Sequence, residues 1–164
     1  MIIRAAAIAD IPTIRSIALA TWPVAYGKIL SPAQLAYMLD LMYSGSALQE
    51  QLSVKGHRFL IGTTDDRAIG FVGFEHRYGG TLNSRLHKLY VLPNTQGTGA
   101  GVLLLSAVED AAREVGDHGL ELNVNRFNPA KEFYLRRGFR ITRDEVIDIG
   151  HGYVMDDHVM EKML

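Results

Sequence analysis

Apolar residues recur at helical spacing near the start of the chain. Over residues 11–20 they lie three or four positions apart on one face, and Asp10 is placed to cap that segment. We predict a short opening strand, then this helix, then an aromatic-rich loop over 21–30 that Pro23 interrupts.

Two further helices are predicted before residue 57. The stretch SPAQ at 31–34 has the spacing of a capping box, with proline at the first helical position, and predicts a helix through residue 42. A serine at 44 or 46 then starts a short helix that ends near residue 52.

The pattern becomes β-rich after residue 57. The runs RFLIGT and AIGFVGFEHRY are joined by the turn TDDR, which predicts a hairpin, and TLNSRLHKLYVL is a third strand that Pro93 ends. A helix over 99–115 and the short strand LELNV follow.

Another helix is predicted over 128–138, with Asn128 as its N-cap and Gly138 beyond its end. The runs FRITRD, EVIDIG and HVMEKML close the chain as strands. This order predicts an α/β (α+β) fold, a mixed sheet with helices on its faces, formed by one domain over residues 1–164.

Composition excludes several classes of function. The chain has 164 residues, 17 Lys and Arg against 18 Asp and Glu, and therefore no basic excess for nucleic acid. It has no cysteine, which excludes disulfides, thiolate metal sites and a cysteine nucleophile, and the spacing of its histidines predicts no metal site. Charged residues break the opening segment, and no apolar run is long enough to span a bilayer, so we expect a cytoplasmic protein with no membrane partner.

The strongest chemical signal is a cluster of three glycines between Gly97 and Gly101, directly before a predicted helix. A dinucleotide fingerprint would require glycine or alanine where Val102 stands, and a Walker A loop would require a Gly-Lys-Ser/Thr tripeptide that the chain lacks. What remains is a loop whose amides point outward at the positive end of a helix and suit a pyrophosphate. A tight turn that needs left-handed glycines is the alternative.

The stretch QGTGAG matches Gln/Arg-x-x-Gly-x-Gly/Ala, the coenzyme A signature of the GCN5-related N-acetyltransferase (GNAT) superfamily, which this chain closely resembles. The segments HKLYVLP and NPAKEFYLRRGF also resemble the fourth strand and a downstream segment of that family. Residues 85–139 carry the specific part of the resemblance, while the order of elements agrees over nearly the whole chain. The resemblance implies a mixed, mostly antiparallel sheet and acetyl-CoA as the cofactor.

The resemblance also implies residue roles. The strand over 120–124 would splay from its neighbour to admit the cofactor, and Tyr134 would protonate the departing thiolate, unless it is an ordinary half-buried aromatic. Asn128 would contact coenzyme A or only cap its helix, and Lys131 could meet a phosphate. The remaining cofactor contacts would come from the backbone of Leu89, Tyr90 and Val91 along the pantetheine arm and from Gln96, Gly97, Thr98, Gly99, Ala100, Gly101 and Val102 around the pyrophosphate.

The general base is less defined. Strand alternation would place Arg85, His87, Leu89 and Val91 on one face. Histone-modifying members of the family carry a catalytic glutamate where Arg85 stands, whereas serotonin-acetylating members have a histidine where His87 stands. His87 is therefore the first candidate, or else a histidine bonded to a neighbouring strand, and Glu75 is the second, or else a solvated strand end.

Aromatic residues suggest where an acceptor would bind. The candidate walls for a small amine, or else ordinary core residues, are Trp22, Tyr26, Tyr43 and Tyr153. A polyamine could be attracted by Asp156 and Asp157, unless both lie in a solvated turn. The sequence therefore predicts transfer of an acetyl group from acetyl-CoA to a primary amine of a small molecule, by direct attack in a ternary complex. Another acyl donor, an oxygen or protein N-terminal acceptor, or a non-catalytic coenzyme A-binding module stay open. Family analogy also allows a homodimer.

Overall fold

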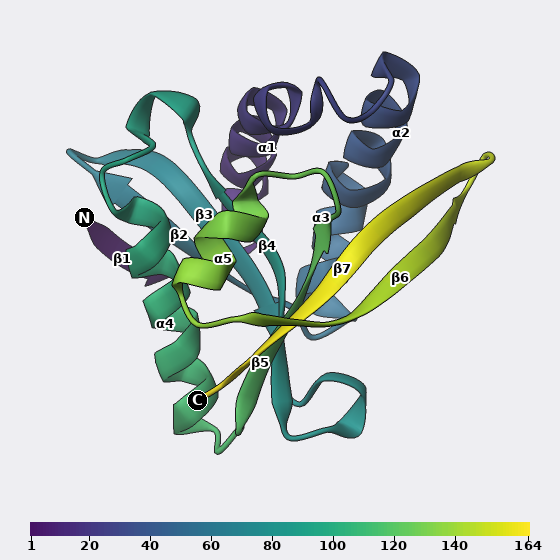
Figure 1. Ribbon diagram of the computed structural model, residues 1–164. Coiled ribbons are helices and arrows are strands. Elements are labelled where there is room, and N and C mark those ends of the chain that lie inside the picture. Colours follow the sequence, from purple (N-terminus) through teal and green to yellow (C-terminus); the bar gives the residue numbers. More distant parts are fainter.

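The computed structural model describes residues 1–164 and contains one seven-stranded sheet with helices on both faces (Figure 1). The strands are β1 (Ile2–Ala5), β2 (Arg58–Thr64), β3 (Arg67–Glu75), β4 (Asn83–Val91), β5 (Gly119–Asn125), β6 (Arg140–Gly150) and β7 (Tyr153–Met163). The helices are α1 (Ile11–Tyr26), α2 (Pro32–Tyr43), α3 (Gly45–Ser53), α4 (Ala100–Glu114) and α5 (Ala130–Arg136). The predicted fold class is confirmed. None of the helices has the length and apolar character that a membrane crossing requires.

The sheet separates at its centre. Its strand order is β1-β2-β3-β4-β5-β7-β6, and every neighbouring pair is antiparallel except β4 and β5. These two parallel strands pair only from Asn83 with Gly119 to Leu86 with Leu122. Beyond Leu86 the edge of β4 that faces β5 has no strand partner, which agrees with the expected splay of the strand over 120–124.

Each face of the sheet has its own core. Helices α1, α2 and α3 cover one face, where Ile14, Trp22 and Tyr43 pack against Phe71. Helices α4 and α5 cover the other, where Leu104 and its neighbours pack against residues that include Val72. The adjacent residues Phe71 and Val72 of β3 thus point to opposite faces, as the alternation of a strand requires.

The predicted hairpin is present between β2 and β3. Asp65 and Asp66 both have left-handed backbone conformations, with φ of 49° and 60°, which is the geometry of a type I′ turn. Aspartate tolerates this region better than most residues, so the TDDR pattern was a reliable local signal.

Two predicted boundaries are wrong. Helix α1 continues through Pro23 to Tyr26, where a loop was expected, because the rings of Trp22 and Tyr26 pack 4.5 Å apart and join the buried core. That burial outweighs the missing amide of Pro23. The chain also ends in two long strands, β6 and β7, joined at His151 and Gly152, where three strands were expected.

A β-bulge in β4 separates Leu89 and Val91 from Arg85 and His87, with which they were predicted to share one face. Gly73 and Phe74 of β3 are adjacent, yet they pair with Lys88 and Leu86, so His87 is an extra residue in β4. Downstream of the bulge the alternation is shifted by one residue. Leu89 and Val91 therefore pack against the core beneath α4, whereas His87 and Lys88 lie on the face that α1, α2 and α3 cover.

Candidate functional site

The loop before α4 presents unpaired amides. Gly97 and Gly99 have φ of 80° and 85°, so both glycines meet a conformational requirement that other residues satisfy poorly. No amide N–H from Gly97 to Val102 donates a hydrogen bond within the protein. Since this run lies at the N-terminus of a helix of 15 residues, it is a concave set of donors at the positive end of a dipole. The arrangement suits an anion with several oxygens.

The unpaired edge of β4 lies beside this loop. Leu89, Tyr90 and Val91 pair with β3 on one side and have no strand partner on the other, because β5 has already diverged. An extended molecule can form backbone hydrogen bonds along this edge as an added strand would.

Helix α5 is positioned by Asn128. Its Oδ1 accepts a hydrogen bond from the amide of Ala130 at 2.9 Å, and Pro129 is the residue that caps the helix, so the predicted cap is displaced by one residue. This bond occupies one lone pair of Oδ1 and leaves the side-chain NH₂ of Asn128 available to a ligand. Lys131, in the first turn of α5, is half-buried.

Three tyrosines lie near the opening between β4 and β5: Tyr134, which is buried, and Tyr26 and Tyr90, which are half-buried. The hydroxyls of Tyr26 and Tyr90 are hydrogen-bonded at 3.1 Å. Tyr134 is only 8% exposed and packs against Phe139, and its hydroxyl has no hydrogen-bond partner in the protein. Burial raises the pKa of Tyr134, and its proximity to Tyr26 raises it further, so the phenol holds its proton at neutral pH.

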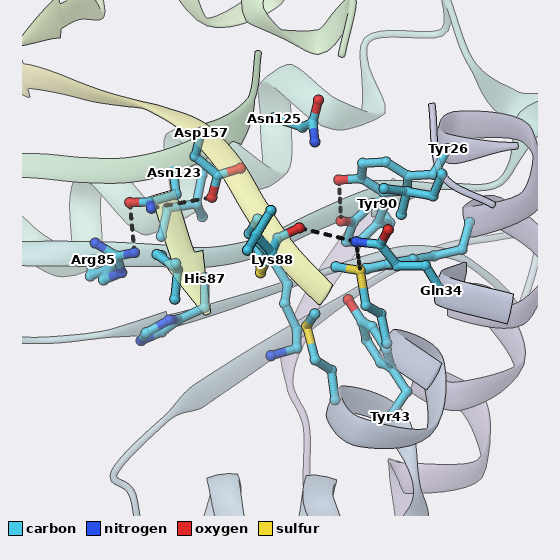
Figure 2. Close-up of a pocket in the computed structure, with 18 residues that line it drawn as sticks. Tyr26, Gln34, Tyr43, Arg85, His87, Lys88, Tyr90, Asn123, Asn125 and Asp157 are labelled. Atoms are coloured by element: carbon cyan, nitrogen blue, oxygen red, sulfur yellow. Dashed lines mark hydrogen bonds between the residues drawn. The ribbon is translucent and has the colours of Figure 1, made fainter. Parts of the chain in front are cut away.

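A pocket of about 260 Å³ opens on the face covered by α1 and α2 (Figure 2). It is lined by Trp22, Tyr26, Leu30, Gln34, Met38, Met42, Tyr43, Arg85, Leu86, His87, Lys88, Tyr90, Asn123, Asn125, Ile147, Val154, Met155 and Asp157. Of the predicted acceptor walls, Trp22, Tyr26 and Tyr43 line it, while Tyr153 packs against Tyr37 outside it.

Gln34 helps to close the pocket. Ser31 caps α2, since its hydroxyl accepts a hydrogen bond from the backbone amide of Gln34. The side chain of Gln34 makes no reciprocal hydrogen bond to the backbone of Ser31, as a capping box would require. It donates instead to the backbone oxygen of Val154 at 3.0 Å, which ties α2 to β7 across the pocket. The capping residue was predicted correctly, and the reciprocal bond was not.

Comparison with known proteins identifies the family. The family model described as an acetyltransferase (GNAT) domain matches residues 30–155. The chain belongs to the GNAT family. An uncharacterized N-acetyltransferase from Mycobacterium tuberculosis is 29% identical over 156 residues, which cover 94% of this chain and 98% of that relative.

Solved GNAT structures share the fold. The PaiA N-acetyltransferase of Thermoplasma acidophilum, solved in complex with coenzyme A, has a TM-score of 0.82 and 25% identity, and the match covers 99% of this chain and 98% of that one. A GCN5-related N-acetyltransferase from Rhodopseudomonas palustris has a TM-score of 0.84 at 21% identity, covering 99% and 95% of the two chains.

The two predicted base residues of this GNAT chain are hydrogen-bonded to each other. His87 Nε2 lies 3.0 Å from Glu75 Oε2, and His57, which stacks on His87 with ring centroids 4.0 Å apart, lies 3.6 Å from the same oxygen. Because a carboxylate only accepts, Nε2 of His87 carries the proton and Nδ1 is its free acceptor. Burial, reinforced by His57 and Lys88, lowers the pKa of His87 to about 2, which makes it a weak base.

The same three groups form a donor set that a metal ion could use, since one ligand atom from each of His57, Glu75 and His87 lies within 4.8 Å of the others. The two imidazole rings are nearly parallel, at 13°, so their in-plane lone pairs run side by side and do not converge on one point. The absence of a metal site therefore stays a prediction.

The structure decides the surroundings of two charged side chains that the sequence had left open in this GNAT protein. Asp157 is 1% exposed, lies 3.3 Å from the Asn123 amide, and has its pKa raised by burial. Arg85, named only as a departure from the family, pairs with Glu121 and with Asn123. No local pattern distinguishes Asp157 from a solvated aspartate, because β5 and β6 pack it from either side of β7.

Proposed function

We propose that this protein transfers the acetyl group of acetyl-CoA to a primary amine of a small molecule, with residues 1–164 acting as one domain. The observation that carries the proposal is the run of unpaired amides from Gly97 to Val102, which lies beside the open edge of β4. A pyrophosphate followed by an extended chain with alternating amides has the complementary chemistry. Coenzyme A contains both parts in that order.

The residues present fit this cofactor along its length. Amides between Gly97 and Val102 would hold the pyrophosphate, together with the predicted contact at Gln96, and Lys131 would meet a phosphate. The backbone of β4 from Leu89 to Val91 would pair with the pantetheine arm, and the Asn128 NH₂ would donate to it. Support for coenzyme A as the ligand comes from the PaiA relative, which was solved in complex with coenzyme A and matches 99% of this chain.

Acetyl-CoA supplies an activated thioester, so that a C–N bond to the amine forms as the C–S bond breaks. The protein holds the two reactants in line, and Tyr134 gives its proton to the leaving sulfur. Tyr26 and Tyr90 surround the reacting centre and exclude water from it. A backbone amide near Val91 polarises the carbonyl oxygen.

Asp157 is the best placed proton acceptor. Its carboxylate faces the pocket, and its raised pKa makes it a stronger base than an exposed aspartate. It binds the acceptor as an ammonium ion and then takes up the proton that the amine must lose before attack. His87 with Glu75 is the alternative base, disfavoured by the lowered pKa of the imidazole.

Small-molecule acceptors fit the pocket better than a protein terminus. Its volume is about 260 Å³, and Gln34 bonds across it to β7. Of the 18 lining residues 11 are hydrophobic, among them aromatic side chains and methionines, which pack on a small organic group.

Thermal unfolding against acetyl-CoA, coenzyme A, NAD and ATP tests the proposal. A ligand at one hundred times its dissociation constant adds about 2.7 kcal/mol to the free energy of unfolding. We expect a rise in melting temperature with acetyl-CoA and coenzyme A alone. Stabilisation by NAD or ATP only, or by none of the four, would show that the loop before α4 is a turn and that the assignment is wrong.

A further inference from the structure

Lys88 is a buried cation without a partner. Its side chain leaves β4 just after the bulge, lines the pocket and is 8% exposed. The ammonium group lies over the rings of Tyr43, at 5.4 Å from the centroid, and Phe59, at 5.8 Å. It makes no hydrogen bond and no ion pair within the protein, and Figure 2 shows it between His87 and Tyr43.

The other charged groups nearby are already engaged. Arg85, the second cation of the pocket, is paired with Glu121 and Asn123. The carboxylate of Glu75 is shared by the two histidines, and that of Asp157 is bonded to Asn123. Lys88 is thus the one lining cation that no protein group neutralises.

Such a group is costly to the fold. Burying an ammonium ion without a counter-ion costs several kcal/mol, and aromatic faces recover only part of that. Burial, reinforced by Lys55, lowers the pKa of Lys88 to about 8, so the side chain is still mostly protonated at pH 7. A residue kept in this state inside a pocket has the properties of a binding site for an anion.

The pocket also has an acidic side. Asp157, from β7, and Lys88, from β4, line the same cavity, and Figure 2 shows Asp157 beside Asn123 and Lys88 on the side of Tyr43. A molecule with a positive and a negative group would satisfy both side chains at once. A diamine or polyamine would satisfy Asp157 but would bring a second cation toward Lys88.

We propose that the acceptor is an amine that also carries a carboxylate, and that Lys88 binds this carboxylate while Asp157 receives the amine. The inference rests on the proposed function and names its substrate class. A carboxylate is favoured over a phosphate monoester, because Lys88 is the only lining cation without a protein partner and its ammonium group lies over the rings of Tyr43 and Phe59. A dianion would find only one unpaired positive charge at this end of the pocket.

Matched acceptors test the proposal. Acetylation is measured with L-leucine against L-leucinamide, with 4-aminobutanoate against 4-aminobutanamide, and with putrescine as the diamine. We expect the carboxylate of at least one pair to exceed its amide by tenfold or more in kcat/KM. Equal or better use of the amides or of putrescine overturns the inference, and so does a lack of turnover with every carboxylate.

Variants of Lys88 test the assignment of the residue. Lys88→Met should remove the preference by raising KM for the carboxylate while leaving the amide unchanged, and Lys88→Arg should keep part of it. Lys55→Met removes an exposed cation that does not line the pocket, and it should keep the preference for the carboxylate. An equal loss for carboxylate and amide in Lys88→Met would show a structural or basic role and overturn the inference.

A binding measurement separates this inference from the proposed function. Trp22 is the only tryptophan and lines the pocket, so its fluorescence reports acceptor binding without turnover. Titration with L-leucine and 4-aminobutanoate should change the emission of the native protein more than titration with the amides, and Lys88→Met should abolish the difference. If the carboxylates change the emission no more than the amides do, the inference is overturned. Failure of acetyl-CoA to raise the melting temperature would instead refute the proposed function.

Discussion

At the scale of single residues, burial decides the chemistry of the candidate site. Tyr134 and Asp157 are both almost fully buried, and burial raises the pKa of each. For the phenol this means that it is protonated before the reaction, although donation to a thiolate becomes less favourable, and for the carboxylate it means a stronger base. In the proposed reaction Tyr134 is therefore the proton donor and Asp157 the proton acceptor.

The role of Tyr134 can be tested by removing only its hydroxyl. Tyr134→Phe should lower kcat on the order of 10²-fold with little change in KM for acetyl-CoA, because the phenol acts only as the sulfur leaves. Steady-state kinetics at pH 7.5 checks this. Tyr153→Phe is the matched control, since Tyr153 lies outside the pocket and should keep full activity. A fully active Tyr134→Phe would assign protonation of the sulfur to water.

The base can be identified by comparing Asp157→Asn with His87→Gln. If Asp157 takes the proton, Asp157→Asn loses both acceptor affinity and kcat, and kcat recovers toward high pH, where the amine is deprotonated by solvent. His87→Gln should then retain most of its activity. The pH dependence of kcat from 6 to 10 checks both variants, and the reverse ranking would return the role to His87.

At the scale of elements, the loop before α4 and the bulge in β4 build the site. The loop depends on local backbone preference, since Gly97 and Gly99 need left-handed conformations that the sequence already suggested. The bulge depends on how β3 and β4 pair, and it brings Lys88 to the same side of the sheet as His87, toward the pocket. One element was predictable because its cause is local, and the other was not.

Two glycines at opposite ends of α4 give a matched test of the loop. Gly99 and Gly116 have φ of 85° and 81°, and a Cβ at either would meet nothing within 4 Å. Each change to alanine should cost about 1–2 kcal/mol of unfolding free energy. Only Gly99→Ala should also weaken coenzyme A binding, by tenfold or more, because its methyl group enters the set of amide donors. Isothermal titration calorimetry with coenzyme A checks this. Equal affinities of the two variants for coenzyme A would show that the loop before α4 does not bind it.

At the scale of the whole molecule, the sheet brings together residues from distant segments. The cluster of His57, Glu75 and His87 combines the residue just before β2, the end of β3 and the middle of β4, which meet because these strands are neighbours. The pocket likewise combines α1 and α2 with the β6–β7 hairpin. Family and fold class were predictable from the order of the motifs. The histidine–glutamate cluster and the pocket lining instead follow from the order and register of the strands in the sheet.

The buried histidines make stability depend on pH. The folded-state pKa of His57 is lowered to about 4 by burial, below the value near 6.5 of an unfolded chain. The unfolded state therefore binds the extra proton first, and stability is full above pH 6.5 and falls as the pH drops toward 4. We expect the free energy of unfolding, measured with urea, to fall by about 1–2 kcal/mol between pH 7 and 5 because of His57.

Two glutamine variants test the source of this pH dependence. His57→Gln should reduce the slope of the unfolding free energy against pH between pH 7 and 5, since glutamine does not titrate. His118→Gln changes an exposed histidine and should leave the slope as it is in the native protein. Equal slopes in all three proteins would mean that His57 takes up its proton without loss of stability.

The sequence by itself determined the features whose causes are local. The β2–β3 hairpin, the caps at Ser31 and Ser44, and the glycine loop before α4 each follow from preferences among residues a few positions apart, and the order of these elements identified the family. Only the tertiary structure decided the rest. Helix α1 runs through Pro23 because distant core residues bury its end, and the bulge at His87, the isolation of Lys88 and the burial of Asp157 arise from strand register and packing between segments far apart in the chain.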